Sequence, residues 1–548
     1  MDESAIWKLI DVYFQENPQA LVRHHIDSYN QFIEEDIFQI FRDMNPLKVR
    51  LSMDDSLQEF RTKCDLYMGG KDGTRVYFGK PIIYDPKNSH YMYPNEARLR
   101  DMTYGITIHY DIEVEYTRIL GPDDIPTEVD ENGYMIFSSM GKDENKENPD
   151  DPRPVREKLT PSEMAKLREN AGKTIDGNQQ LVKVRLEKVY LGKFPIMVQS
   201  NVCILNNIPR LMRFALGECK NDVGGYFIID GKEKAVVPQE AFGDNMINIS
   251  KSSNEKYDYT LEMKSISENI SKPKRTLSLR IMNDTASLTR QNIGVFIPNT
   301  GEVPIPLFVV FRALGVLSDR DIISFCTLQQ PEYTPVSFLP YIDACIHDAA
   351  TILTQEEALE YISRTVKDRS HWRAHQIMAD FLLPHIGELE YLEKAYYLGY
   401  LANRLLSVTV GIEPPTDRDS YKYKRVSLIG PLLKNLFSDY YQMQLKYINL
   451  QIETIHVYNE RAYHDIGVLL HEKYDDIFQK RMVEEGIRKA FKGNWGAYSH
   501  TKIVGVIQDL NRLSHNSMLN HLRKTNLPMD SSLKIVAPRV LHGSQWGI

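Results

Sequence analysis

The chain has 548 residues, of which 42% are hydrophobic and 26% are charged, and its formal net charge is -8. These values are typical of soluble globular proteins, exclude a wholly disordered or collagen-like chain, and suggest about three or four domains. The most apolar stretch, residues 305–317, is interrupted by Arg312, so no segment has the roughly 18 to 20 apolar residues that a membrane span needs.

The five cysteines are scattered and no two form a C-x-x-C pair. This pattern argues against a disulfide framework and against a zinc site. The first residues, Met-Asp-Glu-Ser, have no basic region followed by an apolar one, so a secretory signal is not predicted. Together these features favour a reducing intracellular compartment.

In chain order, the first 60 residues are predicted to be helical, because apolar side chains recur there at helical spacing. Residues 66–116 change to the alternating and β-branched patterns of strands. A hairpin is predicted at residues 129–136, since Asn132-Gly133 suits a type I′ turn. Residues 138–158 are almost entirely polar and predict a loop without a packed core, after which strands resume over residues 181–205.

Residues 251–310 are predicted to be mainly strands, and the chain becomes helical after Pro306. Residues 391–410 give the clearest helix, residues 431–491 are also helical, and loops with short helices follow from Gly493. The predicted fold class is therefore α+β, multidomain, with strands and helices partly segregated.

Positive charge is concentrated at one end of the sequence. Residues 486–548 contain nine Lys or Arg and two Asp, a net charge of +7, which leaves -15 for the rest of the chain. Such a segment is either a solvated protein surface or a surface that contacts nucleic-acid phosphates.

Other motifs predict no self-contained active site. Residues 225–232 miss the spacing of a phosphate-binding loop. The adjacent His24 and His25 would point about 100° apart on a helix, which is poor for one metal ion. Residues 417–419, Asp-Arg-Asp, are compatible with a two-carboxylate metal site, but a local ion-pair network is favoured. The same choice, a catalytic cluster or a favoured ion-pair network, applies to Glu96, Arg98, Arg100 and Asp101.

A series of segments along the chain is informative when the segments are taken in order. They are residues 21–32 (LVRHHIDSYNQF), 93–104 (YPNEARLRDMTY), 192–200 (GKFPIMVQS), 218–234 (ECKNDVGGYFIIDGKEK), 311–315 (FRALG), 383–386 (LPHI), 417–419 (DRD), 430–433 (GPLL), 493–496 (GNWG), 510–512 (LNR), 521–528 (HLRKTNLP), 537–542 (APRVLH) and 545–547 (QWG). In this order they resemble the second-largest subunit of multisubunit DNA-directed RNA polymerases, and are most similar to the version found in eukaryotic polymerase II and in large DNA viruses. Each segment alone is modestly specific, but their order along nearly the whole chain is highly specific.

The resemblance implies an architecture. Residues 1–240 would form the first part of the domain called the protrusion, and residues 241–405 the lobe. Residues 406–470 would return to the protrusion, and residues 471–548 would be the fork. In the family, fork loops lie beside the downstream edge of the RNA–DNA hybrid, which agrees with the charge count.

The resemblance also implies a function within a complex. The chain would be the N-terminal part of the subunit and would contribute to DNA template and RNA–DNA hybrid binding in a nucleotidyltransferase, DNA-directed RNA polymerase. The family's subunit is about twice as long, so the partners would be the largest subunit and the remaining half of this subunit, with no membrane. A split gene, an intron or intein, or a truncated sequence would each give this length.

The resemblance implies no catalytic and no metal-binding residue in this chain, and it predicts that the isolated chain is inactive. This chain would bind no cofactor, and Mg²⁺ would be held mainly by the largest subunit of the assembled enzyme. The location would be intracellular: the nucleus or, if the chain is viral, the cytoplasm or the virion. A second hypothesis is a free-standing nucleic-acid-binding or regulatory module derived from that subunit.

Position and charge together predict the nucleic-acid contacts, with Asn511 as a further polar contact. Trp495 and His542 are predicted to be core residues rather than base-stacking ones. The pair at 523 and 524 is Arg-Lys where the family usually has Arg-Arg, and residues 530–533 lack a basic residue that relatives often carry. The predicted nucleic-acid-binding residues are Lys502, Gln508, Arg512, Arg523, Lys524, Lys534 and Arg539.

Overall fold

The computed structural model divides the chain into two compact units. Unit 1 consists of Met1–Glu240 and Val426–Lys534, and unit 2 consists of Ala241–Arg425 and Ile535–Ile548. The residues described are 3–54, 59–85, 88–120, 127, 129–130, 132–136, 175–176, 179–252, 254–269, 272–283, 291–301, 303–329, 335–366, 370–418, 420–458, 465–528 and 543–545.

Unit 1 is built on an antiparallel sheet of six strands with the order β1-β2-β6-β8-β7, and β3 pairs with β6. Smaller sheets of unit 1 join β4 to β5, and β18 to β10 and β9. Its strands are β1 (Leu47–Asp54), β2 (Glu59–Met68), β3 (Val76–Phe78), β4 (Ile82–Asp85), β5 (Asn88–Tyr91), β6 (Gly105–Ile119), β7 (Ile175–Asp176), β8 (Gln179–Pro195), β9 (Phe227–Ile229), β10 (Lys232–Val236) and β18 (Ile507–Asp509). Two further strands, β11 (Gln239–Phe242) and β17 (Lys424–Ser427), pair with each other where the chain passes from one unit to the other.

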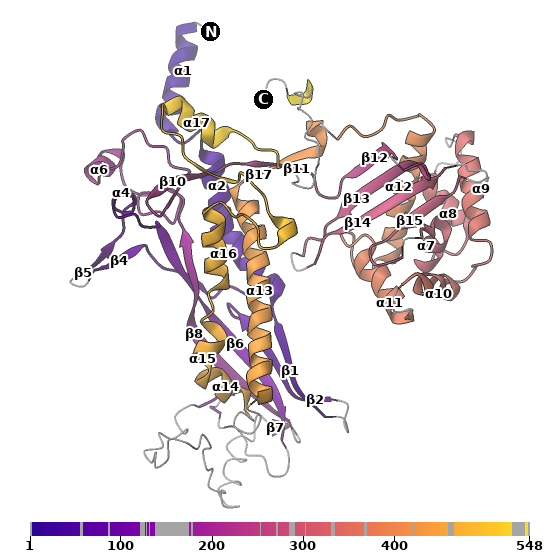
Figure 1. The fold of residues 1–548 in the computed structure, drawn as a ribbon, viewed down its shortest axis with the longest axis horizontal. Coiled ribbons are helices and arrows are strands. Elements are labelled where there is room, and N and C mark those ends of the chain that lie inside the picture. The colour runs from indigo at the N-terminus through magenta and orange to yellow at the C-terminus, as the bar shows by residue number, and fades with distance from the viewer. Residues whose placement is uncertain are drawn as a thin grey trace, which may run out of the picture. The chain divides into compact units, whose positions relative to one another are not determined.

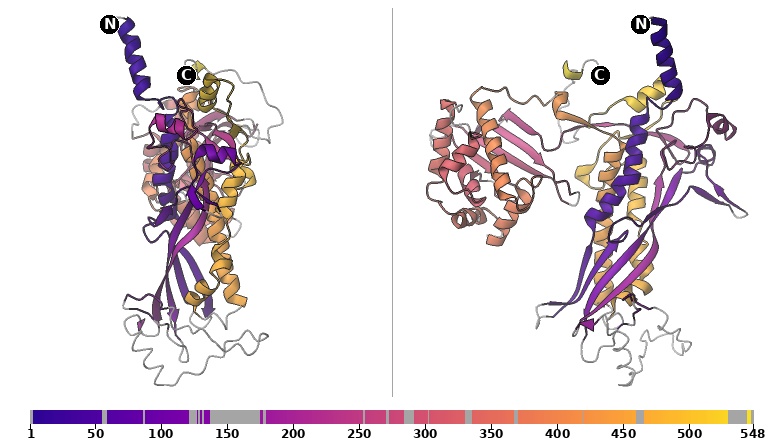
Figure 2. Two further views of the ribbon diagram at one scale, coloured as in Figure 1. Left: turned by 90° about the vertical axis from the view of Figure 1, so that its left-hand side faces the viewer. Right: turned by 180° about the vertical axis from the view of Figure 1, so that it is seen from behind.

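Helices of unit 1 pack against the large sheet. Figure 1 and Figure 2 show the long helix α13 lying along the sheet, where it packs against β1 while α16 packs against β8. The helices are α1 (Glu3–Glu16), α2 (Arg23–Gln31), η1 (Phe32–Asp36), α3 (Ile37–Met44), α4 (Pro94–Leu99), α6 (Arg210–Ala215), α13 (Ile429–Tyr458), α14 (Ile466–Glu472), α15 (Tyr474–Phe478), α16 (Met482–Phe491) and α17 (His515–Arg523).

The core of unit 1 follows from two periodicities. In β6 every second side chain from Ile108 to Tyr116 is buried, which is the period of a strand with one face on a core. In α13, Leu433, Phe437 and Tyr441 are buried at intervals of four residues, which places them on one helix face. The ring of Phe437 stacks on that of Tyr441 with centroids 5.7 Å apart, so aromatic packing closes this core.

Unit 2 combines an antiparallel five-stranded sheet, in the order β12-β13-β14-β15-β16, with a set of helices. Its strands are β12 (Ile247–Lys251), β13 (Tyr257–Ser265), β14 (Arg275–Met282), β15 (Ile293–Phe296) and β16 (Ile305–Pro306). Its helices are α7 (Leu307–Ala313), α8 (Asp319–Cys326), α9 (Leu339–Asp348), α10 (Gln355–Thr365), α11 (His371–Gln376), η5 (Ile377–Phe381) and α12 (Tyr391–Thr409).

The most apolar stretch of the sequence forms α7, whose seven residues are all buried. Arg312, which interrupts that stretch, is buried with it. Its guanidinium donates to the carbonyl of Ala349 over 2.6 Å and to a carboxylate oxygen of Asp319 over 2.5 Å. A buried charge is tolerated when it is paired and hydrogen-bonded in this way. Among the helices of the described residues, none has the length and apolar composition to cross a bilayer.

The α+β fold class is confirmed, as are the strands within 251–310 and the helix at 391–410, observed as α12. An antiparallel bridge between Val129 and Met135 confirms the hairpin. Residues 138–158 lie outside the described residues.

Two predicted boundaries are wrong. Helix was predicted throughout the first 60 residues, but β1 occupies part of them. Val49 and Leu51 are buried, whereas Lys48 is exposed and Arg50 is half-buried, which is the alternation of a strand. The strand predicted over 181–205 ends at Pro195, and turns follow it.

Candidate nucleic-acid interface

The basic C-terminal segment is attached to unit 1 through its backbone. Strand β18 pairs with β10, with Gln508 opposite Ala235. Further along, the amide of Asn526 donates to the carbonyl of Pro238, and the amide of Glu240 donates to the carbonyl of Asn526. The segment therefore continues the small sheet of unit 1, and the side chains it carries are held at defined positions.

Helix α17 is fixed at both ends. At its start the hydroxyl of Ser514 accepts from the amide of Ser517, as an N-cap does. At its end the Nε2–H of the buried His25 donates to the carbonyl of Leu522 over 2.5 Å, and Arg523 donates to the carbonyl of Leu21 over 2.8 Å. The start of α2 thus holds the end of α17.

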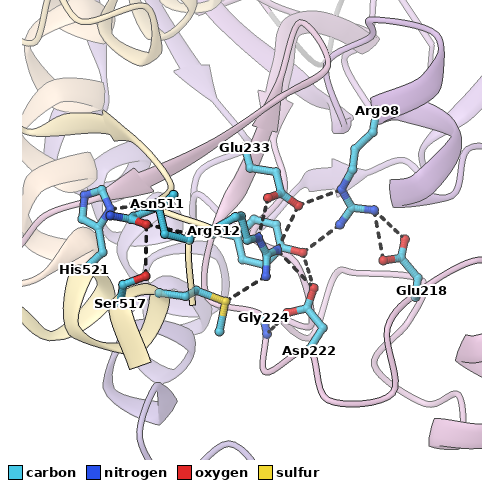
Figure 3. A network of polar contacts seen from close by, with 12 residues as sticks. Arg98, Glu218, Asp222, Gly224, Glu233, Asn511, Arg512, Ser517 and His521 are labelled. Atoms are coloured by element: carbon cyan, nitrogen blue, oxygen red, sulfur yellow. Dashed lines mark hydrogen bonds and ion pairs between the residues drawn. The ribbon is translucent and has the colours of Figure 1, made fainter. Parts of the chain in front are cut away.

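Two arginines share three carboxylates beside this segment (Figure 3), and we call the set Arg98, Arg512, Glu218, Asp222 and Glu233 the arginine–carboxylate network. Arg512 donates to both oxygens of Glu233 over 2.7 and 2.9 Å and to Asp222 over 3.4 Å. Arg98 donates to Glu233 over 2.9 Å and to both oxygens of Glu218 over 3.0 Å. Paired bonds of this geometry are among the strong hydrogen bonds of proteins.

The network keeps Glu233 ionised. Burial by itself would raise the pKa of Glu233, but the hydrogen bonds and charges of Arg512 and Arg98 outweigh it and lower that pKa below its usual value. Tyr226, buried at the centre, donates to Asp222 over 2.5 Å and accepts from Arg98 over 2.7 Å. The arrangement is typical of a structural ion-pair network that attaches the segment to unit 1, since each described group in it already has partners within the chain.

A second group of side chains lies at the end of α17. The Nδ1 of His521 accepts from the backbone amide of Asn511, so its Nε2–H donates to Gln508 over 3.1 Å. The same oxygen of Gln508 accepts from the ammonium of Lys524 over 2.7 Å. Burial, together with the nearby charge of Lys524, lowers the pKa of His521, which keeps the imidazole neutral. Gln508 therefore orients Lys524.

The predicted binding residues that the structure describes fall into three groups. Lys502, Arg523 and Lys524 are exposed. Gln508 and Asn511 are tied into the chain: Asn511 accepts from the hydroxyl of Ser517 over 3.0 Å. The arginine–carboxylate network includes Arg512. Lys534 and Arg539 lie outside the described residues, as does His542.

The net charge of the segment overstates its capacity to bind anions, because several of its cations are paired with carboxylates of the same chain. Lys492 pairs with Asp230 over 2.7 Å and Lys489 approaches Glu485 over 3.7 Å. Arg523 and Lys524, in contrast, bind neutral oxygens, and neither is paired with a carboxylate in the described part of the chain. Among the predicted contacts that the structure describes, these two residues and the exposed Lys502 are therefore best suited to bind phosphates, and we call them the exposed cation set.

Several interpretations of the sequence can be compared with the structure. The favoured ion-pair network is confirmed for Arg98, and also for Glu96, which pairs with Arg100 over 3.0 Å. Trp495 is confirmed as a core residue, since it is 3% exposed and packs near Phe491. Over the residues described, no three His, Cys, Asp or Glu side chains are grouped so that they could hold a metal ion.

Comparison with known proteins gives the family. A family model described as RNA polymerase beta subunit matches residues 20–469. Subunit RPB2 of DNA-directed RNA polymerase II from Schizosaccharomyces pombe is 28% identical over 562 residues, which are 99% of this chain and 40% of that protein. Subunit 2 of DNA-directed RNA polymerase II from Arabidopsis thaliana is 28% identical, over 99% of this chain and 41% of its own length.

An archaeal relative, subunit Rpo2 of the DNA-directed RNA polymerase from Saccharolobus shibatae, is 26% identical over 99% of this chain and 39% of its own length. The chain belongs to the RNA polymerase beta subunit family. Within that family it corresponds to the N-terminal part of the second-largest subunit. It spans about 40% of the length of these relatives.

Proposed function

We propose that this chain assembles into a multisubunit DNA-directed RNA polymerase and that its exposed cation set contacts phosphates of the DNA template or of the RNA–DNA hybrid. The observation that carries the proposal is the attachment of three exposed cations, Lys502, Arg523 and Lys524, to a backbone that continues the sheet of unit 1. Phosphate contacts position a duplex without reading its sequence, which suits an enzyme that copies any template.

The hydrogen bonds of the predicted residues support a different proposed role for each of them. Gln508 positions Lys524, and Arg512 fastens the segment to the three carboxylates around it. The domain names protrusion, lobe and fork remain part of this proposal. So do the nucleotidyltransferase activity of the complex, the magnesium held by the largest subunit, and a location in the nucleus or, for a virus, in the cytoplasm or virion.

The test is the salt dependence of template binding by the enzyme purified from its source. Each phosphate contact that is lost should flatten the slope of log affinity against log salt by about one unit. We expect Lys502→Ala, Arg523→Ala and Lys524→Ala each to do so. Lys489→Ala is the matched control, since it removes the same charge from the same segment but from a lysine that faces Glu485. Equal slopes for the control and the three variants would refute the proposal.

The second hypothesis, a free-standing nucleic-acid-binding module, predicts that different proteins co-purify with the chain. If the tagged chain elutes from its source without the largest polymerase subunit, the polymerase proposal fails and the module remains. If the largest subunit co-elutes and the tagged complex extends RNA on a template, the module hypothesis fails.

A further inference from the structure

Helix α1 (Glu3–Glu16) exposes an unusual amount of apolar surface. None of its residues is buried, although half of them are large and apolar. Figure 1 and Figure 2 show α1 projecting from unit 1 in every view. The exposed fractions are 42% for Ile6, 60% for Trp7, 59% for Leu9, 39% for Ile10, 48% for Val12, 54% for Tyr13 and 45% for Phe14.

The apolar residues occupy more than one face of the helix. At about 100° per residue, they extend around an arc of about 220°, from Val12 and Leu9 on one side to Phe14 and Trp7 on the other. A helix that lies on a flat core needs an apolar stripe of only about 100° or a little more. An arc this wide requires a groove whose two walls contact opposite sides of the helix.

Most polar residues of α1 mark the side that would stay in water. Ser4, Lys8, Asp11 and Gln15 form one narrow stripe, whereas Glu3 and Glu16, at the two ends of the helix, lie within the apolar arc. The helix carries three acidic residues and one lysine, a net charge of -2. Helices that bind membrane surfaces have polar faces rich in Lys and Arg, so this charge argues against a lipid surface.

Self-association explains the surface poorly. A two-stranded coiled coil buries a seam of only two positions in seven, which would leave most of the arc of α1 exposed. Helices of about 14 residues are also marginal by themselves in water. The occupant must therefore be a larger body with an apolar groove. Trp, Tyr and Phe are enriched among the residues that anchor such interfaces.

We infer that α1 inserts into an apolar groove on the portion of the second-largest subunit that has no counterpart in this chain, and thereby joins the two portions. This inference rests on the proposed function. Its support is the share of the relatives that the chain spans, about 40%, which leaves about 60% of a subunit to be contacted. Interfaces within a permanent assembly are the ones with core-like apolar composition, which α1 has.

Site-specific photo-crosslinking in the assembled enzyme tests the inference. A photoreactive residue is placed at Phe14 or Val12, which lie about 160° apart around the helix, and at Asp11 on the polar stripe as the control. We expect both apolar positions to crosslink to the remaining portion of the second-largest subunit, at least about fivefold more efficiently than Asp11. A groove with two walls predicts that the two positions reach different peptides of that portion.

The outcomes separate the inference from the proposed function. If the largest subunit does not co-elute with the chain, the proposed function fails and the inference fails with it. If it co-elutes, crosslinks to a second copy of this chain, to lipid or to any other polypeptide overturn the inference. Equal crosslinking yields at Asp11 and at the apolar positions, or no crosslinks at all, overturn it as well.

A pair of variants gives an independent readout. Trp7→Ser with Phe14→Ser should weaken retention of the remaining portion by at least about tenfold, because large aromatic anchors carry much of an interface's binding energy. Both side chains are exposed in this chain, so circular dichroism of the chain alone should not change. Unchanged retention would overturn the inference.

Discussion

Arg512 and Arg523 belong to the same basic segment, and their surroundings predict opposite consequences of removal. Arg512 binds two carboxylates, whereas Arg523 binds one backbone carbonyl. We expect Arg512→Ala to loosen the segment without changing the salt dependence of template binding. We expect Arg523→Ala to flatten that salt dependence and to loosen the segment only slightly.

The magnitude follows from the contacts. Arg512→Ala removes two short bonds to Glu233, whose side chain is 18% exposed, and a longer one to Asp222. Hydrogen bonds to charged groups contribute about 1.5 to 3 kcal/mol, but the 40% exposure of Arg512 means that water screens part of this. The expected loss is about 2 kcal/mol. Arg523→Ala removes one exposed bond, worth about 0.5 kcal/mol.

Amide hydrogen exchange measures this local loss directly. Since about 1.4 kcal/mol corresponds to a tenfold change in an opening equilibrium, the amides of β18 should exchange about 30-fold faster in Arg512→Ala and about twofold faster in Arg523→Ala. The salt slope of template binding is measured on the same two variants. If Arg512→Ala flattens the slope by about one unit and leaves exchange unchanged, Arg512 is a phosphate contact and the argument from its partners is refuted.

Three further predictions concern buried groups. Burial lowers the pKa of His25 to about 4, and because this lies below the unfolded value of 6.5, unit 1 should lose up to about 3 kcal/mol as the pH falls from 6.5 to 4; urea unfolding across this range should show the loss, and His25→Gln should not show it. Burial also lowers the pKa of Lys394 to about 8, while its ammonium donates to the carbonyls of Met378 and Ala379. The stability of unit 2 should therefore rise between pH 8 and 10, and Lys394→Met, which removes the titrating group, should abolish that rise in urea titrations of the two chains. A methyl group at Gly430 would lie 2.4 Å from the carbonyl oxygen of Ser28, so Gly430→Ala should cost about 2 kcal/mol in denaturant unfolding, and an unchanged midpoint would contradict the close packing of α13 on α2.

Local sequence patterns predicted the elements that local patterns control. The alternation in β6 and the helical spacing in α12 are visible without knowledge of the fold, and both elements form where they were expected. Strand β1 was missed although Val49 and Leu51 alternate with Lys48 and Arg50, because the helical spacing of the preceding residues was extended too far. The error lay in where one period ends, which is the least certain part of such an argument.

The candidate site was predictable only as a location. A count of Lys and Arg identifies the basic segment, but it does not show which cations are already neutralised. Arg512 pairs with Glu233, which lies 279 positions earlier in the sequence. Arg523 donates a hydrogen bond to the carbonyl of Leu21, 502 positions earlier. Only the folded chain brings these groups together, so the roles of the two arginines could not be separated from composition or spacing.

The fold divides the positive charge of the segment between two tasks. Cations that meet carboxylates, such as Arg512 and Lys492, attach the segment to unit 1. Cations that meet only neutral oxygens keep their charge available for an external anion, as Arg523 and Lys524 do. The division has a physical basis, because a phosphate that bound Arg512 would have to displace Glu233, whose ionised form the same arginine stabilises. A phosphate at Lys524 displaces only an amide oxygen. If the segment binds nucleic acid, as proposed, we therefore expect its attraction to depend on the described cations that have no carboxylate partner and not on its net charge of +7.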